Sequence, residues 1–209
     1  MIKALPTVYK GIEFRSKLEA QWAATLDALE VPWLYEVEGY QLSDGTRYLP
    51  DFYLPDSDQF FEVKGVMTDK DMHKIEQLSK DSGKDVVIGY PDGHVQMWQE
   101  RIWCNNLIYG ETCNENCVEC TECAKDYTFI PANDMTLAKC RNCGKQWFMS
   151  IEGYWKCKCC GEYDGDHHHL IGWIENEPLN KACLEHPGAY KEYIVAAFKH
   201  SFVKIIPKG

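Results

Sequence analysis

The sequence predicts a compact α/β unit, followed by a small cysteine-rich lobe that binds metal and by a C-terminal helix. Helix-like and strand-like hydrophobic patterns alternate up to Trp103, which is typical of an α/β domain. All eleven cysteines lie between Cys104 and Cys183, and helical spacing returns over residues 188–202. The expected divisions of the 209-residue chain are therefore 1–103, 104–170 and 171–209.

The composition is that of a folded protein. Hydrophobic residues make up 45% of the chain, which is ordinary for a folded domain and too high for a disordered one. No apolar run approaches the length of a membrane span, and the N-terminus lacks the apolar core of a signal peptide. We therefore expect a cytoplasmic protein with no membrane partner. Thiols stay reduced in the cytosol, so the cysteines need an explanation other than disulfides.

The charge of the chain constrains its partners. A formal charge of −10 argues against non-specific coating of nucleic acid, which usually requires a basic domain. It does not exclude a nuclease, because carboxylates that bind cations contribute negative charge which the cations neutralise.

A helix and a strand are the first predicted elements. Over residues 14–29, apolar side chains recur at helical spacing on one face, namely Leu18, Trp22, Leu26 and Leu29. Pro32 ends this helix, and residues 33–37 read as a strand.

Two strands joined by a turn come next, and they carry the candidate site. Residues 48–54 and 60–63 are apolar and rich in aromatic side chains, and a Pro-Asp-Ser-Asp turn separates them. Side chains alternate along a strand, so Glu62 and Lys64 project from the face opposite to their apolar neighbours. If the strands pair, Asp51 on the first strand meets Glu62 and Lys64 at one end of a sheet.

The remaining elements of the first half follow in order. Thr68 can cap a helix that extends to about Ser82, where Gly83 ends it. Residues 85–90 form a short buried strand, and residues 94–98 form another after a turn.

The polar residues of the first half resemble the motif of the PD-(D/E)xK nuclease superfamily. Here it consists of Pro50-Asp51, ten intervening residues and Glu62-Val63-Lys64, with Glu19 on the upstream helix. The resemblance covers roughly the first half of the chain. It implies a restriction-endonuclease-like α+β core, a mixed sheet flanked by helices, and a phage-type or resolvase-like endonuclease in a bacterial or phage-infected cytosol.

The residue chemistry suits metal-dependent hydrolysis of DNA phosphodiester bonds. Asp51, Glu62 and the main-chain carbonyl of Val63 can hold Mg²⁺ or Mn²⁺, since hard cations prefer oxygen ligands. Glu19 would ligate a second ion or orient its water. Lys64 would orient or deprotonate the attacking water, or contact the phosphate. The expected partner is duplex or branched DNA, and two chains could pair as a homodimer to cut both strands.

Paired cysteines predict structural zinc, because two Cys-x-x-Cys pairs supply four thiolates to a tetrahedral ion. The pairs are Cys120/Cys123, Cys140/Cys143 and Cys157/Cys160. Residues 140–161 resemble a zinc ribbon, with a knuckle, a strand, a turn, a second strand and a second knuckle. The small lobe has too little apolar core to fold without metal.

Two pairings of the ligands are compatible with the spacing. One joins Cys140/Cys143 to Cys157/Cys160 and leaves a second cluster of Cys113, Cys117, Cys120 and Cys123. The other joins Cys120/Cys123 to Cys140/Cys143, and Cys157/Cys160 to Cys183 and His186. We favour the first because its knuckles are connected by cleaner strands and a cleaner turn, and the second stays open.

The C-terminal segment is locally basic in an acidic chain. Between residues 189 and 209 one glutamate stands against four lysines, namely Lys191, Lys199, Lys204 and Lys208. This helix is therefore the expected phosphate-facing surface, and with the zinc lobe it would help to bind DNA.

Two alternatives to this function remain from the sequence. Residues 166–169 resemble part of an HNH nuclease core, so a second nuclease site near His167 and His168 is a minor alternative. The other alternative is a non-catalytic zinc-ribbon adaptor that binds nucleic acid or protein. The intact set of Asp51, Glu62 and Lys64 favours the nuclease, because a relic tends to lose at least one such residue.

Overall fold

The computed structural model describes residues 5–102, 125–140, 142–150, 157, 159–160, 189–201 and 206–207. Several predicted features lie outside these residues: the second ribbon strand, Cys113, Cys117, Cys120, Cys123, His167, His168, Cys183 and His186. Among the helices in the described ranges, none is both long and apolar enough to cross a membrane.

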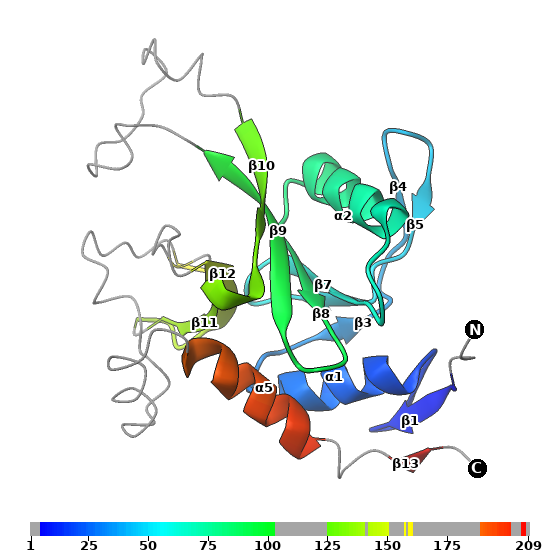
Figure 1. Cartoon of the computed structure of the whole chain (residues 1–209), viewed down its shortest axis with the longest axis vertical. Helices are drawn as coiled ribbons and strands as arrows, with labels where there is room; N and C mark the ends of the chain where they lie inside the picture. The colour runs from blue at the N-terminus through cyan, green and yellow to red at the C-terminus, as the bar shows by residue number, and fades with distance from the viewer. Residues whose placement is uncertain are drawn as a thin grey trace.

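A six-stranded mixed sheet forms the centre of the molecule, in the order β10-β9-β8-β7-β6-β3 (Figure 1). Its strands are β3 (Leu34–Tyr35), β6 (Phe52–Leu54), β7 (Gln59–Val63), β8 (Val86–Gly89), β9 (Val95–Ile102) and β10 (Lys125–Ile130). Strands β7 and β8 are parallel, and the other neighbours are antiparallel. The prediction of an α+β core with a mixed sheet is confirmed at this level.

Helices cover both faces of the sheet (Figure 1). α1 (Lys17–Ala28) and α5 (Ala189–Ser201) share a hydrophobic cluster with Phe61 and Val87 on one face. α2 (Asp69–Ser82) packs on the other face, where its buried residues share a second cluster with Phe60. The alternation of β7 thus sends Phe60 and Phe61 into different cores, as the period of two predicts.

The helix ends follow from local capping. Ser16 is extended and its hydroxyl accepts a hydrogen bond from the Glu19 N–H, so α1 begins three residues later than the predicted residue 14. At α2 the structure confirms the prediction: Thr68 and Asp71 form a capping box, and Gly83 ends the helix with a positive φ of 67°.

The predicted single strand over residues 48–54 is in fact two strands. β4 (Tyr40–Gln41) pairs with β5 (Arg47–Tyr48), whereas β6 pairs with β7 in the central sheet. The single-strand prediction was wrong because Pro50 has no N–H to continue a ladder. The chain therefore changes sheets immediately before Asp51.

Two further small ladders complete the described elements. β13 (Ile206–Pro207) and β2 (Ile12–Phe14) flank β1 (Thr7–Tyr9), which brings the two ends of the chain together. The short helix η2 (Ala132–Asp134) leads into β11 (Met135–Lys139), which pairs with β12 (Gln146–Ser150).

The cysteine region shares its core with the first half of the chain. The Gln59 side-chain amide donates to the Phe148 carbonyl at 2.8 Å, and the Phe148 N–H donates back to Gln59 Oε1 at 3.1 Å. The rings of Phe61 and Phe148 lie 5.7 Å apart. α5 is tied to α1 in a similar way, since Gln21 Nε2 donates to the Phe198 carbonyl at 2.6 Å. The expected division into three units stays a prediction.

Gly89 is required by the close approach of α1 to the sheet. A Cβ atom at this position would lie 2.5 Å from the Trp22 ring and 2.7 Å from the Phe61 ring. Both rings are fully buried, so neither can move aside easily.

We predict that Gly89→Ala lowers the free energy of unfolding by about 1–3 kcal/mol through overpacking. Chemical denaturation followed by circular dichroism measures this change. Gly65→Ala is the matched control, because a Cβ at Gly65 meets no atom within 4 Å, and it should leave the unfolding midpoint nearly unchanged. Equal effects of the two substitutions would contradict the packing argument.

Candidate functional site

Asp51 and Glu62 lie side by side where β6 and β7 meet. The Asp51 N–H donates to Glu62 Oε1 at 3.1 Å, and the Val63 N–H donates to Asp51 Oδ2 at 2.8 Å. Both side chains are almost completely buried, with Asp51 5% exposed and Glu62 1% exposed. The antiparallel register pairs Phe52 with Phe61. Asp51, one residue before Phe52, therefore lies opposite Glu62, one residue after Phe61.

Lys64 and Tyr48 surround the Glu62 carboxylate. Lys64 Nζ lies 2.9 Å from Glu62 Oε2, and the Tyr48 hydroxyl donates to the same oxygen at 2.6 Å. The predicted convergence of Asp51, Glu62 and Lys64 is therefore present in the structure. Tyr48 was not identified from the sequence; the signal was its position two residues before Pro50.

Arg15 connects Glu19 to the buried pair. Its guanidinium is ion-paired with Asp51, and its Nε lies 2.7 Å from Glu36 and 3.8 Å from Glu19. The Glu19 carboxylate is held by the Tyr35 hydroxyl at 2.5 Å and by the Ser16 hydroxyl at 2.8 Å.

Glu19 thus reaches Asp51 through a cation rather than directly. Sequence reasoning missed Arg15 and Tyr35, although the spacing of four residues from Arg15 to Glu19 was a usable signal for Arg15.

The electrostatics of the site follow from burial of like charges. Burial, and then the charge of Glu62, raise the pKa of Asp51 well above its ordinary value, against the opposing effects of Lys64 and the Val63 N–H. Burial lowers the pKa of Lys64, but the charges of Glu62 and Asp51 outweigh it and leave that pKa raised. Lys64 is therefore an ammonium ion at neutral pH.

Asp51 and Glu62 are the residues that could hold a hard divalent cation. Two adjacent carboxyl groups supply the oxygen ligands that Mg²⁺ or Mn²⁺ prefers. In this structure the positive groups beside them are Arg15 and Lys64.

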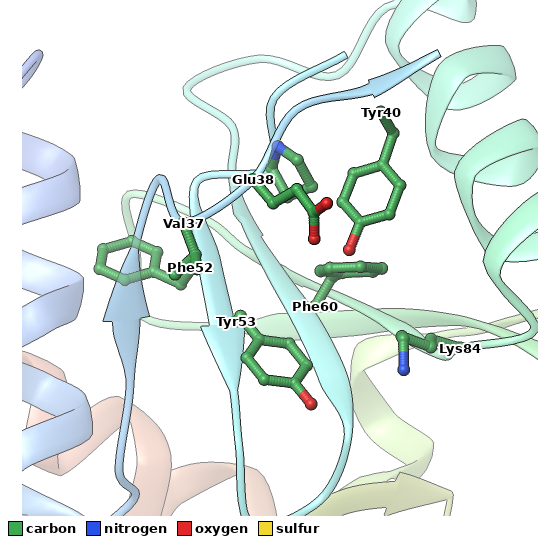
Figure 2. A pocket seen from close by; sticks show the side chains of 8 residues that line it. Val37, Glu38, Tyr40, Phe52, Tyr53, Phe60 and Lys84 are labelled. Atoms are coloured by element: carbon green, nitrogen blue, oxygen red, sulfur yellow. The ribbon is translucent and has the colours of Figure 1, made fainter. Parts of the chain in front are cut away.

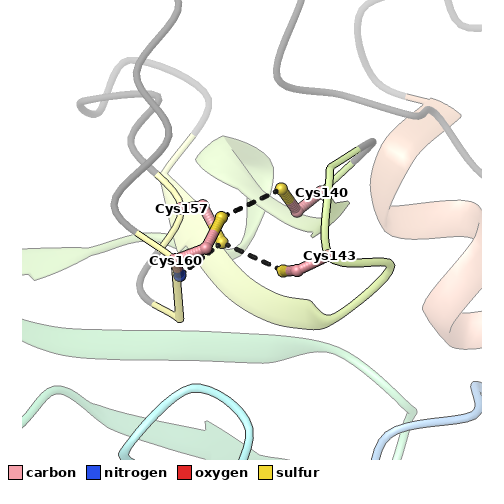
Figure 3. A group of neighbouring side chains, drawn as sticks. All are labelled: Cys140, Cys143, Cys157 and Cys160. Atoms are coloured by element: carbon pink, nitrogen blue, oxygen red, sulfur yellow. Dashed lines mark hydrogen bonds between the residues drawn. The ribbon is translucent and has the colours of Figure 1, made fainter.

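Four cysteine side chains from two knuckles form a second candidate site (Figure 3). The sulfur atoms of Cys140, Cys143, Cys157 and Cys160 all lie within 4.8 Å of one another. This is the grouping of the favoured pairing. In the part of the chain that the structure describes, no other group of three or more such ligands is this tight, and the trio Glu19, Asp51 and Glu62 is not.

The geometry of this cysteine cluster fits tetrahedral zinc. The sulfurs of Cys140 and Cys160 are 3.7 Å apart and those of Cys143 and Cys157 are 3.6 Å apart. Zinc–sulfur bonds of about 2.3 Å at tetrahedral angles place sulfur atoms about 3.8 Å apart. None of these four cysteines forms a disulfide, so each can supply a thiolate to a metal.

Three of the four thiols of the cluster have a raised pKa, which favours their protonated form when no metal is bound. Burial raises the pKa of Cys140, Cys143 and Cys157, although nearby backbone N–H groups act in the opposite direction. Binding of zinc must therefore release protons, and the affinity should rise with pH.

The cysteine cluster is attached to the turn between β6 and β7. Cys159 donates its S–H to the Asp56 carbonyl, and Lys145 Nζ lies 3.1 Å from the Asp56 carboxylate. Cys159 is not part of the cluster. A metal bound by the knuckles would thus help to fix the turn between β6 and β7. Asp51 and Glu62 lie on either side of this turn.

The basic C-terminal surface is described only in part. Of its four lysines, the structure describes the side chain of Lys199, which is exposed on α5. The predicted phosphate-facing role of this segment stays a prediction.

Comparison with known proteins identifies no family. No protein-family model matches the chain, and no curated protein sequence matches it. The function must therefore be argued from the residues of the two sites and from their geometry.

We predict that the purified protein contains at least one zinc ion per chain and that Cys143→Ser removes about one of them, because the knuckles lose a thiolate. Elemental analysis after dialysis measures the content. Cys159→Ser is the matched control and should retain its zinc, since this sulfur contacts the Asp56 carbonyl instead. A wild-type content below one ion per chain would contradict the assignment.

We predict that Asp51→Asn raises the melting temperature near pH 7 when no divalent cation is added. The pKa of Asp51 is raised in the folded state, so the folded protein binds more protons than the unfolded chain. Wild-type stability therefore falls as the pH rises above the unfolded pKa of about 3.9. The advantage of Asp51→Asn should therefore shrink as the pH approaches about 4. Melting curves over a pH series measure it.

Asp81→Asn is the control of opposite sign. The Ser43 N–H holds the pKa of Asp81 below its usual range, so wild-type stability from this group is present at neutral pH and is lost on acidification. If both variants followed the same pH trend, the argument about Asp51 would be wrong.

Proposed function

We propose that the protein is a metal-dependent deoxyribonuclease of the PD-(D/E)xK type that hydrolyses phosphodiester bonds in DNA. The single observation that carries this proposal is the buried pair of Asp51 and Glu62, with Lys64 Nζ 2.9 Å from Glu62. Burial of two adjacent carboxylates costs stability. Such a costly arrangement is typical of a functional site.

The order of elements supports a restriction-endonuclease-like core. α1 carries Glu19, β6 and β7 form an antiparallel pair beside Asp51 and Glu62, and α2 leads into β8, which is parallel to β7. This is the order that the resemblance in the sequence implied. It is a fold-level argument, so the residues of the site carry the greater weight.

Asp51, Glu62 and the Val63 carbonyl would hold Mg²⁺ or Mn²⁺. When bound, the cation supplies Lewis acidity and neutralises charge on the phosphoryl oxygens. Arg15 would have to release Asp51 for this to occur, and the freed guanidinium would lie where it can bind a phosphate. Glu19, held by Tyr35 and Ser16, would position the polar groups around Asp51.

Lys64 would act as a cation rather than as a base. Its raised pKa keeps the ammonium form, which donates hydrogen bonds and cannot accept a proton. In the hydrolysis, it would bind a phosphoryl oxygen or orient the water that attacks phosphorus. The attacking water would lose its proton to a neighbouring water, and the leaving oxygen would take a proton from solvent as the ester P–O bond breaks. The Lys64 ammonium would then stabilise the negative charge that develops on the phosphoryl oxygens.

The second half of the chain would contribute to DNA binding. Structural zinc in the cysteine cluster would stiffen the turn at Asp56, and α5 presents the exposed Lys199. Duplex or branched DNA is the proposed partner, and a homodimer would allow both strands to be cut.

We predict that the purified protein cuts DNA only with Mg²⁺ or Mn²⁺, and that Asp51→Ala and Glu62→Gln each lower the rate about 100-fold or more. Gel assays on linear, supercoiled, single-stranded and branched DNA measure the cutting. Glu76→Gln is the control, because Glu76 pairs with Lys80 on α2, away from the site, and this variant should keep the wild-type rate.

The same experiment distinguishes the proposed nuclease from the alternative function, a non-catalytic zinc-ribbon adaptor. Cutting that persists in both site variants would refute the proposed site. DNA or protein binding with no cutting under any metal condition would instead favour the zinc-ribbon adaptor.

A further inference from the structure

A small aromatic cavity lies beside the hairpin that carries Asp51 and Glu62 (Figure 2). Its volume is about 280 Å³, just below the range of about 300–1,000 Å³ typical of small-molecule sites. The rings of Tyr40, Tyr53 and Phe60 form its walls: Tyr40 meets Phe60 edge-on at 5.3 Å, and Tyr53 lies 5.9 Å from Phe60. Such a space accommodates one planar ring system.

Polar groups lie at the edge of the cavity. Figure 2 shows the carboxyl group of Glu38 and the hydroxyl of Tyr40 ending near the Phe60 ring. Lys84 also lines the cavity, and its ammonium is ion-paired with Asp58. Burial, together with the charges of Glu38 and Asp58, raises the pKa of Tyr40, so its hydroxyl remains a donor at neutral pH.

These charges favour a neutral aromatic occupant. Lys84 and Asp58 largely neutralise each other as an ion pair, and the Glu38 carboxylate opposes an anionic ligand. An uncharged planar ring with amino groups fits these charges, because it stacks on aromatic side chains and donates hydrogen bonds to a carboxylate.

The cavity adjoins the candidate active site. Pro50 lines it and is followed directly by Asp51. Phe60 and Glu62 project from the same face of β7, and two residues along a strand span about 7 Å. Tyr40 is paired with Tyr48, whose hydroxyl donates to Glu62. A nucleotide held at the acidic pair would therefore carry its base, or that of its neighbour, to the cavity.

We infer that this cavity binds one unpaired nucleobase next to the phosphodiester bond that is cut. The inference rests on the proposed nuclease function and narrows its substrate to DNA with an unpaired nucleotide. A base stacked inside a duplex cannot enter such a cavity without being unpaired. Glu38 accepts from the exocyclic amino group of cytosine or adenine, and the half-buried rings of Tyr40 and Tyr53 provide stacking surfaces.

The test uses the full-length protein and 2-aminopurine, a fluorescent adenine analogue whose emission falls on stacking. One duplex carries it as a single extrahelical base, and a matched duplex carries it paired with thymine. Binding and emission are measured without added divalent cations, so that the DNA stays intact. Cutting of both duplexes with Mg²⁺, by wild type and by Asp51→Ala, is measured in parallel.

We expect wild type to quench the extrahelical base and to bind that duplex more tightly than the paired one. Tyr40→Leu should abolish the quenching and weaken binding to the extrahelical duplex about 5- to 100-fold. Tyr9→Leu is the matched control: Tyr9 is also half-buried but lies in β1, so this variant should behave as wild type. Circular dichroism verifies that both variants are folded.

Three results would overturn the inference. Cutting that depends on Asp51, with equal binding of both duplexes and no effect of Tyr40→Leu, would refute the base pocket and leave the proposed nuclease intact. Tyr40-dependent binding of tetramethylammonium, without a change in 2-aminopurine emission, would assign the cavity to a cation. Failure to bind or cut either duplex would refute both the pocket and the nuclease.

Discussion

Burial of two carboxylates next to each other is the constraint around which this protein is arranged. Burial, and then the charge of Glu62, raise the pKa of Asp51 well above its ordinary value. Several elements supply the compensation. Arg15, just before the N-cap of α1, pairs with Asp51. Tyr48 on β5 and Lys64, the residue after β7, contact Glu62. The same pair of charges therefore restricts the position of each of these elements. A small displacement of any one of them would change the contacts of Asp51 or Glu62.

The cysteine cluster and the acidic site are mechanically connected. The turn after β6 holds Cys159 and Lys145 through Asp56, and Gln59 at the start of β7 pairs with the main chain of Phe148. Gln59 is fully buried, so its amide oxygen would lose the hydrogen bond from the Phe148 N–H if β12 moved away. Zinc binding would thus act on the acidic pair through the hairpin. The aromatic cavity is lined in part by the same hairpin. The cysteine cluster, the acidic pair and the proposed base pocket therefore all contact the hairpin of β6 and β7.

Local rules predicted much of the fold, and their failures have specific causes. The Thr68 cap, the Gly83 stop and the alternation of Phe60 with Phe61 depend on neighbours in sequence, and the structure confirms them. The run over 48–54 contains the right residue types for one strand, but Pro50 divides it between two sheets. The start of α1 was placed too early because Phe14 belongs to β2. This strand pairs with β1, and no helical pattern in the sequence reveals that pairing.

The sequence by itself determined which residue types could meet: two strands whose pairing would bring Asp51 to Glu62 and Lys64, and cysteine pairs spaced for a tetrahedral ion. Both depend on short-range geometry, the period of two along a strand and the tight turn between paired cysteines. Only the tertiary structure decided that Arg15 bridges Glu19 to Asp51, that Cys140 and Cys143 join Cys157 and Cys160, and that aromatic side chains from β4, β6 and β7 enclose a cavity. These contacts join segments far apart in the chain, and the packing of whole elements brings them together, which no local pattern encodes.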